Sequence, residues 1–274
     1  MRDQAEDDPQ RWYSTNLVGL PAGLIASLDF NRHPQPLSIH GTRETHRGLF
    51  RLLDEADDLA VAADIFRHYM QIVFGLARPP DGARDPEQRR FHVSYLKLLQ
   101  GWGFDANSPQ GAVLKGWVES RFGLIPNFHR APLERFPSPA WVQYLEEKHG
   151  SRFHNNSIHA QLDLLWEYCQ WAVQRFGLPA REQVRLWRGV NRNDGQIVLS
   201  GSLRQGACVV RFNNLVSFTT LRERAEEFGD WILETQVPAV KLLFFPGLLG
   251  KAPLSGEGEV LALGGLYQVR ASYA

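Results

Sequence analysis

The sequence predicts an α+β protein: a mainly helical part over about residues 1–180, followed by a strand-rich part over 181–274. Up to Phe176, apolar residues recur at helical spacing. After Pro179 they occur in short runs rich in β-branched and aromatic residues. Helices followed by strands, rather than alternating with them, are typical of an α+β architecture. We expect its sheet to be mixed. The two parts are either separate regions packed together or one continuous domain.

Helical spacing indicates several helices in the first part. One begins near Arg43, and a second covers about residues 58–76. A third is expected from about Pro86 to Leu99, and a fourth after Ser108-Pro109, where serine caps and proline occupies the first helical position. The residues expected to face inward in the first two helices are Leu49, Leu52 and Leu53, then Ile65, Tyr69, Ile72 and Val73.

The clearest helical pattern runs from about Ser157 to Phe176 and stops at Gly177. Before it, residues 121–138 contain three prolines and are expected to form a connection. In the second part a short helix is expected over about residues 221–228. The predicted strands cover residues 184–190, 197–200, 207–212, 231–237, 240–245, 260–263 and 267–271.

Composition excludes several classes of protein. Lys plus Arg equals Asp plus Glu at 30 each, which argues against a basic nucleic-acid-binding face. No apolar run approaches the roughly 20 residues that cross a bilayer, and the start of the sequence is acidic and polar rather than a signal peptide. The two cysteines, Cys169 and Cys208, show no pairing pattern. These features favour a soluble cytoplasmic protein.

Familiar nucleotide and metal motifs are missing from the sequence. No G-x-G-x-x-G follows a predicted strand, and no G-x-x-x-x-G-K-[ST] is present. His149, His154 and His159 recur every five residues, which does not keep them on one helical face, and H-E-x-x-H is absent. We therefore expect no metal site.

The first group of candidate functional residues lies in the first predicted strand of the second part. Alternation places Val184, Leu186 and Arg188 on one face, so Arg188 ends an apolar row. A buried guanidinium needs an anion or several acceptors, and its fork suits phosphate or carboxylate. Gly189 would let a ligand approach the backbone closely. The alternatives are that Arg188 forms an internal ion pair or lies at an exposed strand end.

The second group is Ser217-Phe218-Thr219-Thr220, where a strand leads into the short helix. Thr220 with Glu223 three residues later is expected to form a capping box. Ser217 and Thr219 remain as two hydroxyls on one strand face. Such hydroxyls suit contacts with a ligand or support of a nearby carboxylate.

The third group is Glu257-Gly258-Glu259, the only E-x-E in the chain. In a strand both carboxylates share a face, with Cα atoms about 6.6 Å apart. Two carboxylates this close repel each other, and an ordinary sheet gains no stability from the pair. The simple alternative is an edge strand that exposes both acids to water. The preceding loop carries Leu248-Leu249 at its tip, which either contacts a partner or packs into the core.

The three motifs follow one another along the sequence: Arg-Gly at a strand end, then Ser-Phe-Thr-Thr before a helix, then E-x-E at the start of a late strand. This order resembles the R-S-E pattern of mono-ADP-ribosyltransferases. The motifs cover about residues 184–271, and the whole chain resembles the branch of that family that acts on dinitrogenase reductase. The resemblance implies a split β-sandwich core and NAD as the substrate. It departs from the family at the second motif, which is usually Ser-Thr-Ser.

By that resemblance, Arg188 would hold the NAD phosphates and ribose, and the Gly189 backbone would meet the nicotinamide amide. Ser217 and Thr219 would support the ribose and Glu259, with the hydroxyl that supports Glu259 left open. Glu259 would be the catalytic carboxylate. Members with E-x-E modify arginine, which implies that Glu257 handles the acceptor. The resemblance further implies an arginine of the nitrogenase iron protein as the target and a PII signalling protein as regulator.

These residue types suit the chemistry. Breaking the bond between nicotinamide and ribose develops positive charge on the sugar, which a carboxylate such as Glu259 stabilises. A guanidinium stays protonated and is a poor nucleophile, so a second carboxylate that orients it and takes its proton would help. Two alternatives remain, an NAD glycohydrolase and a catalytically silent module on the same fold. Part of the helical region is expected to form a docking surface for the target or a regulator.

Overall fold

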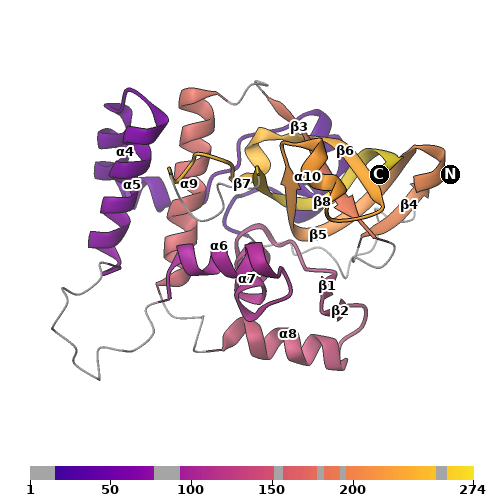
Figure 1. The fold of residues 1–274 in the computed structure, drawn as a ribbon. Helices are drawn as coiled ribbons and strands as arrows, with labels where there is room; N and C mark the ends of the chain where they lie inside the picture. The colour runs from indigo at the N-terminus through magenta and orange to yellow at the C-terminus, as the bar shows by residue number, and fades with distance from the viewer. Residues whose placement is uncertain (1–15, 77–92, 151–156, 178–181, 192–195, 251–257) are drawn as a thin grey trace.

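The computed structural model describes residues 16–76, 93–150, 157–177, 182–191, 196–250 and 258–274. Within them the α+β prediction is confirmed, because helices occupy the first part and strands the second (Figure 1). The helices are α1 (Ala22–Ile25), α2 (Leu28–Arg32), α3 (Thr42–Thr45), α4 (Arg47–Asp54), α5 (Leu59–Val73), α6 (Tyr95–Phe104), α7 (Pro109–Phe122), α8 (Pro139–His149), α9 (Ile158–Phe176) and α10 (Arg222–Glu226).

Side-chain caps begin several of these helices, and the one at Ser108 stands where the sequence predicts it. The carboxylate of Asp58 accepts from the Val61 N–H at the start of α5. The Ser108 hydroxyl accepts from the Gly111 N–H ahead of the proline that opens α7. α9 ends at Phe176 with Gly177 as its C-cap. These helix boundaries are therefore fixed by local hydrogen bonds that the sequence reveals.

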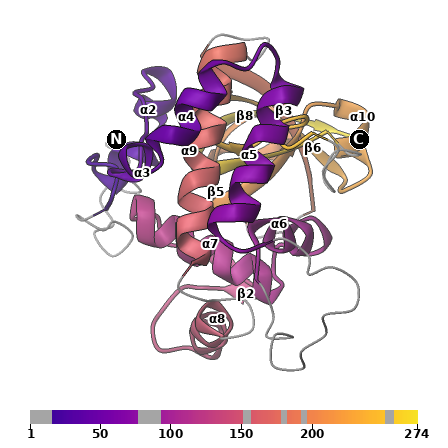
Figure 2. The same ribbon diagram turned by 90° about the vertical axis from the view of Figure 1, so that its left-hand side faces the viewer.

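The predicted inward faces of α4 and α5 are partly wrong. Leu49 and Leu53 are buried, but Leu52 is 51% exposed. In α5, Ile72 is 82% exposed, and the buried stripe contains Ala62, Ala63, Phe66 and Met70 instead. The stripe is set by α9, which lies beside α5 (Figure 2), because Phe66 stacks on Tyr168 with ring centroids 4.1 Å apart. Small alanines on α5 allow that approach, Ile65 and Tyr69 are partly buried, and Ile72 and Val73 face outward.

Two further helical predictions need correction. α6 runs past Leu99 to Phe104, and residues 86–92 of the predicted helix lie outside the described residues. Gly101 weakens the helical pattern, but its missing Cβ leaves room for the Gln110 side chain, 2.5 Å from where that Cβ would stand. α8 was not predicted, and the connection before it includes a short antiparallel pair, β1 (Phe128–His129) and β2 (Ala131–Pro132).

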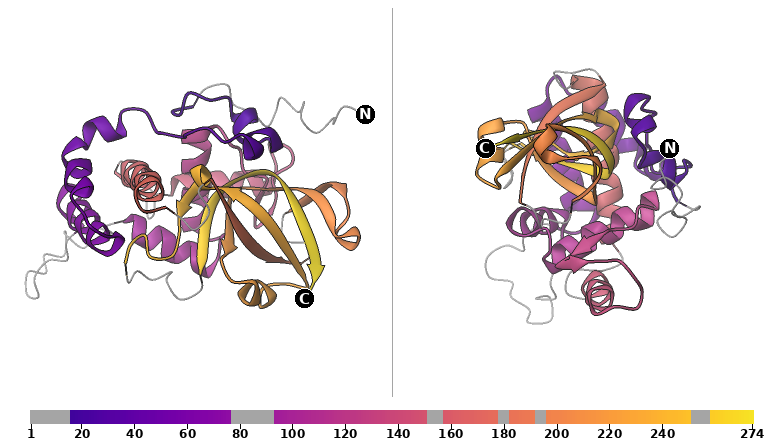
Figure 3. Two further views of the ribbon diagram at one scale, coloured as in Figure 1. Left: turned by 90° about the horizontal axis from the view of Figure 1, so that it is seen from above. Right: turned by 90° about the vertical axis from the view of Figure 1, so that its right-hand side faces the viewer.

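The other described strands form a six-stranded sheet in the order β4-β5-β3-β6-β8-β7, and β5 also pairs with β8. The pairing of β5, β8, β6 and β3 therefore closes a ring, seen as the curved strands of Figure 3. Every described pairing is antiparallel, so a mixed sheet is wrong. The strands are β3 (Gln183–Val190), β4 (Ile197–Gly201), β5 (Ala207–Thr219), β6 (Trp231–Pro238), β7 (Leu242–Phe244) and β8 (Glu259–Tyr273).

The two long strands differ most from the prediction. Residues 260–263 and 267–271 belong to one strand, β8, which continues through Gly264-Gly265. β5 likewise continues from Phe212 to Thr219 through an irregularity at Asn213-Asn214. A Cβ on Gly264 would stand 1.5 Å from the Asn213 carbonyl oxygen, so these glycines serve close contact between two bent strands rather than a turn. At residues 240–245, a 3₁₀ turn (Ala239–Lys241) precedes β7.

The main cluster of buried apolar side chains in the described chain contains residues from both parts. α9 is the central contact: the Gln170 amide donates to the Leu242 carbonyl at 2.8 Å, and the Tyr168 hydroxyl donates to the Leu248 carbonyl at 2.9 Å. Cys169 and Cys208 are buried and unpaired. No described helix is both long enough and apolar enough to cross a membrane.

Candidate functional site

The three sequence motifs meet at one pocket of about 330 Å³ between the sheet and the end of α6. Arg188 and Gly189 come from β3, Ser217 and Thr219 from β5, and Glu259 from the start of β8. β5 lies between the other two strands here, because Thr219 is paired with both Trp187 and Glu259. Residues of the helical part, Trp102 and the segment 103–107, form the opposite wall.

Arg188 lies half-buried at the end of the apolar row that contains the fully buried Leu186. Its Nη1 donates to the Ser217 carbonyl oxygen at 2.8 Å. This bond joins β3 to β5 beside the pocket and fixes the guanidinium plane. A guanidinium has five N–H donors, so the group held in this way suits an anionic ligand in the pocket.

The Ser217 hydroxyl contacts Glu259, a contact that the sequence left open between Ser217 and Thr219. The Ser217 Oγ is 2.7 Å from the Glu259 Oε1 and 2.7 Å from the Trp102 Nε1. An indole N–H only donates, so the Ser217 oxygen accepts from Trp102 and its own proton points to the carboxylate. The side chain of Glu259 is thereby oriented by a chain of two hydrogen bonds that begins in the helical part.

Thr219 and Thr220 play other parts in this structure. Thr219 is 7% exposed, and its hydroxyl oxygen accepts from the Leu221 N–H at 3.1 Å. The capping box predicted for Thr220 is wrong, because α10 begins after Leu221 with no side-chain cap. The Thr220 hydroxyl instead lies 3.5 Å from the Gly258 carbonyl oxygen, and the Thr220 N–H donates to the same oxygen at 3.1 Å. These bonds attach the turn before Glu259 to β5.

Two glycines of the motifs are required by close backbone contact. A Cβ on Gly189 would stand 2.0 Å from the Ala225 carbonyl oxygen of α10, so one side of Gly189 is filled by protein. Gly258 has a φ of +62°, and a Cβ there would lie 2.8 Å from the Thr220 Oγ1. Gly258 thus allows the left-handed turn that delivers Glu259 onto the sheet. Glu257 lies outside the described residues.

Sequence reasoning missed Trp102 and Trp187, which both line the pocket. Trp102 is 3% exposed, and the Nζ of Lys115 lies over its ring at 5.9 Å. The Trp187 Nε1 is buried and has no hydrogen-bond partner among the described residues. Neither tryptophan belongs to a recognisable motif; only the strand pairing and the packing of α6 bring them here.

A buried cation lies behind the Trp102 wall. The Lys115 Nζ donates to the Asn107 Oδ1 and the Phe128 carbonyl oxygen, both at 3.1 Å, and lies 3.3 Å from the His129 Nδ1. Burial lowers the pKa of Lys115 to about 7. Burial, reinforced by the nearby Lys115, also lowers the pKa of His129. The cluster therefore rests partly neutral near pH 7.

The loop before the third motif does not offer an apolar tip to a partner. Leu248 is fully buried and Leu249 is 1% exposed, so the alternative in which they pack into the core is correct. In the described part of the chain, no three potential ligand side chains gather into a metal site. Exposed apolar groups occur instead at the pocket itself, where Phe104 is 93% and Phe228 57% exposed.

Comparison with known proteins identifies the family of this chain. A family model described as dinitrogenase reductase ADP-ribosyltransferase matches residues 15–271. The chain belongs to the dinitrogenase reductase ADP-ribosyltransferase family. The NAD(+)–dinitrogen-reductase ADP-D-ribosyltransferase of Rhodospirillum rubrum is 52% identical over 285 residues, and the alignment covers 100% of each chain. No solved structure matches the chain.

Proposed function

We propose that this protein transfers ADP-ribose from NAD to an arginine of dinitrogenase reductase, the nitrogenase iron protein, and thereby switches nitrogen fixation off. The observation that carries the proposal is the chain of contacts from Arg188 through Ser217 to Glu259 in one pocket. Family membership and the name of the Rhodospirillum rubrum relative support both the reaction and the target.

In this proposal Arg188 holds the phosphates of NAD, and the Gly189 backbone and Thr219 line the space for the nicotinamide end. When the bond between nicotinamide and ribose breaks, the electron pair leaves with nicotinamide and the sugar becomes cationic. Glu259 stabilises that charge, and a carboxylate already oriented by Ser217 needs little rearrangement to do so. Trp187 is a further candidate for NAD contact, because the residue lines the same pocket.

Glu257 is proposed to act on the acceptor rather than on NAD. An arginine guanidinium is a nucleophile only when a base removes its proton as the new bond to the ribose forms. Glu257 precedes Glu259 by two residues and is assigned that role, in which it also aims the guanidinium. The proton therefore ends on a carboxylate and the ADP-ribose on the target nitrogen, so that charge and atoms balance.

The partners belong to the same proposal. The protein would act in the cytoplasm, where its nitrogenase target is found, and a PII signalling protein would regulate it. The support for PII is the family resemblance alone. A pull-down of purified PII protein by this chain, with and without adenine nucleotides, tests that part separately from the chemistry.

The decisive experiment is intact-mass measurement of dinitrogenase reductase after incubation with NAD and this protein, beside Glu257→Gln and Glu259→Gln. Wild type should add one ADP-ribose. Glu259→Gln should add none and release no nicotinamide. Glu257→Gln should still release nicotinamide but should not modify the target.

Other outcomes identify the alternatives. Nicotinamide release by wild type without added mass on the target would leave an NAD glycohydrolase or another target. Unchanged transfer by Glu257→Gln would remove the role given to that residue. No nicotinamide release under any condition would leave a binding module only.

A further inference from the structure

Two neighbouring residues of the motif pocket, Phe104 and Asp105, have been given no part in the chemistry so far. Phe104 is the last residue of α6, and Asp105 directly follows it. Both line the pocket that Glu259 lines, on the wall opposite the sheet. Phe104 is 93% exposed and Asp105 is exposed as well, whereas Trp102, from the same wall, is 3% exposed. Trp102 therefore lies deep in the pocket, and the two exposed residues lie at its rim.

Helix geometry and hydrogen bonds hold this rim in place. Residues two apart on a helix point to different sides, so the burial of Trp102 turns Phe104 outward. The Asp105 Oδ1 accepts from the Asn107 N–H at 2.8 Å, which closes a tight turn after the helix. Trp102 in turn bonds Ser217 on the sheet at 2.7 Å. The rim is therefore attached to the residue that orients the proposed catalytic carboxylate.

The turn explains one oxygen of Asp105 but not its charge. An asparagine would accept the same hydrogen bond, and the helix dipole disfavours a carboxylate just after a helix C-terminus. The charge raises the pKa of Lys115, which burial lowers, but the Lys115 ammonium bonds other groups. No described residue forms an ion pair with Asp105. A residue type that its local structure disfavours is expected where function requires it.

The combination of residues at the rim suits a planar cation. One exposed phenylalanine needs no explanation by itself, but here an exposed ring, a carboxylate and a pocket coincide. The face of a phenyl ring attracts a guanidinium, and a carboxylate accepts hydrogen bonds from the guanidinium fork. A carboxylate also repels phosphate groups, so Asp105 does not suit the diphosphate of NAD.

We propose that Phe104 and Asp105 form the subsite that receives the guanidinium of the acceptor arginine. The ring of Phe104 packs against the guanidinium plane, and Asp105 accepts hydrogen bonds from its N–H groups. The inference rests on the transfer reaction proposed above, in which Glu257 takes the proton from the acceptor. It assigns acceptor binding to the helical part of the chain. The partner it fits is a protein whose arginine projects far enough to pass this rim.

A second cation also enters this pocket, the nicotinamide ring of NAD, which is positively charged until its bond to ribose breaks. The proposed function places that ring beside the Gly189 backbone and Thr219, on the sheet. Thr219 is 7% exposed, so the nicotinamide lies deeper than the rim. The two cations are told apart by kinetics, because contact with the acceptor alters the KM for the target and contact with nicotinamide alters the KM for NAD.

The test measures transfer of ADP-ribose to dinitrogenase reductase by the full chain, first over a range of target concentrations at saturating NAD and then the reverse. Phe104→Leu keeps an apolar side chain and removes the ring face, so it should raise the KM for the target about fivefold. Asp105→Asn keeps the turn and removes the charge, so it should raise that KM about tenfold. Phe104→Tyr keeps the ring face and should behave as wild type. In each variant the KM for NAD should change by less than about twofold.

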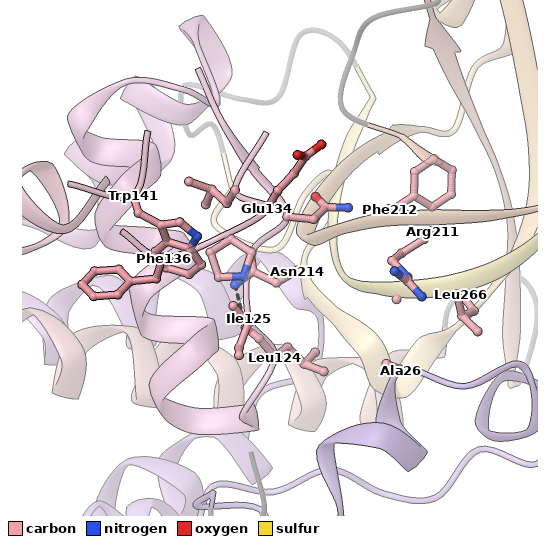
Figure 4. Close-up of a pocket in the computed structure, with 14 residues that line it drawn as sticks. Ala26, Leu124, Ile125, Glu134, Phe136, Trp141, Arg211, Phe212, Asn214 and Leu266 are labelled. Carbon is pink, nitrogen blue, oxygen red and sulfur yellow. Dashed lines mark hydrogen bonds between the residues drawn. The ribbon is translucent and has the colours of Figure 1, made fainter. Parts of the chain in front are cut away.

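Matched controls come from other parts of the chain. Phe136 is 64% exposed and lines a second pocket together with Trp141, away from every motif residue (Figure 4). Phe136→Leu therefore makes the same change at a distant exposed ring. Asp58 accepts from the Val61 N–H at the start of α5, so Asp58→Asn removes a charge from another helix end. Neither control should change the KM for the target.

Unchanged KM for the target in Phe104→Leu and Asp105→Asn would overturn the inference, and a rise in only one of them would remove the other residue from the subsite. A rise in the KM for NAD as large as that for the target would assign the rim to nicotinamide instead. So large an effect in Phe136→Leu or Asp58→Asn would also count against a local role. No transfer by wild type would contradict the proposed function itself, whereas normal transfer by the variants contradicts this inference alone.

Discussion

At the scale of single residues, the indole N–H of Trp102 decides the direction of the Ser217 hydroxyl. Without that donor, Ser217 would be free to rotate its proton away from Glu259, and the carboxylate would lose its fixed orientation. The Trp102 N–H bonds Ser217 rather than Glu259, so it acts on the carboxylate through Ser217. It is therefore a positioning residue rather than a catalytic one.

Trp102→Phe keeps the ring in the wall of the pocket and removes only the donor. We expect nicotinamide release to slow by about 10–100-fold in kcat, a smaller loss than the removal of a whole charge-stabilising donor, while KM for NAD changes little. Steady-state assays of NAD cleavage measure both constants. Trp171→Phe is the control, because its indole donates to Asp54 at 2.8 Å, far from the pocket residues. Equal losses in the two variants would count against the positioning role.

Two buried lysines make stability depend on pH. Burial lowers the pKa of Lys115 and of Lys241 to about 7, against about 10.5 in an unfolded chain. Between these values the unfolded state binds more protons than the folded state, so stability rises with pH. We expect the free energy of unfolding to increase from pH 7 to pH 9 by a few kcal/mol at most.

Lys241→Met isolates one of the two contributions. Its Nζ donates to the Asn31 Oδ1 at 2.6 Å and lies over the rings of Phe30 and Tyr267. In this variant the free energy of unfolding, measured by urea denaturation at several pH values, should rise less steeply with pH than in wild type. Lys115 should account for the rise that remains. A slope as steep as that of wild type would show that Lys241 is charged at pH 9 in the folded protein.

At the scale of elements, β5 and β8 depend on paired irregularities. Asn213-Asn214 interrupts β5 opposite Gly264 of β8, and the neighbouring Gly265 packs against Ala26, the residue that follows α1. A Cβ on Gly265 would stand 2.7 Å from the Cα of Ala26, and its φ is +114°. The bend thus brings the first helices of the chain onto the sheet.

Gly265→Ala should destabilise the protein by more than its backbone strain alone. Gly41→Ala is the matched control, since Gly41 has a φ of +82° and open space around it. We expect about 1–2 kcal/mol for Gly41→Ala from the left-handed backbone, and a clearly larger loss for Gly265→Ala. Chemical denaturation measures both. Similar losses of unfolding free energy in the two variants would mean that the chain around Ala26 moves to make room for the new Cβ without loss of stability.

The local sequence pattern predicted most helix and strand positions, but few of the contacts between distant parts of the chain. The cap at Ser108 and the stop at Gly177 follow from hydrogen bonds within a few residues, so the sequence revealed them, whereas at Asp58 it indicated the helix start but not the cap. The glycines in β8 resembled a turn because their purpose is a contact with distant chain. In the same way R-S-E residues could be named from spacing, but Trp102 could not, since it bonds a residue 115 positions further on.

At the scale of the whole molecule, the helical and strand-rich parts share their apolar core. Buried residues of α5, α7 and α9 belong to the same cluster as those of the sheet. Glu167 of α9 is fully buried and bonded to the Ile39 N–H at 2.6 Å, so the first residues of the described chain are tied to the centre as well. The boundary proposed near residue 180 therefore separates two patterns of sequence that depend on each other for burial.

A fragment that contains only residues 182–274 should not fold. Removing the helices would expose the face of the sheet that α9 covers, including the fully buried Leu242 and Leu243, and would take away Trp102. We expect no cooperative thermal transition by circular dichroism and no NAD cleavage. A fragment that unfolds cooperatively would show that the strands form an independent domain, and the helices could then be studied as a separate docking surface.

The place of β8 in the sheet has a consequence for how the protein is made. This strand pairs with β5, β6 and β7, yet it follows all of them in chain order. During synthesis the ribosome releases the helices and the other strands first. The residues proposed to bind NAD are therefore made before Glu259. A message cut short, or a ribosome that stalls before β8, yields a chain with no Glu259. If Glu259 has the role proposed for it, a chain must extend into β8 before it can cleave NAD.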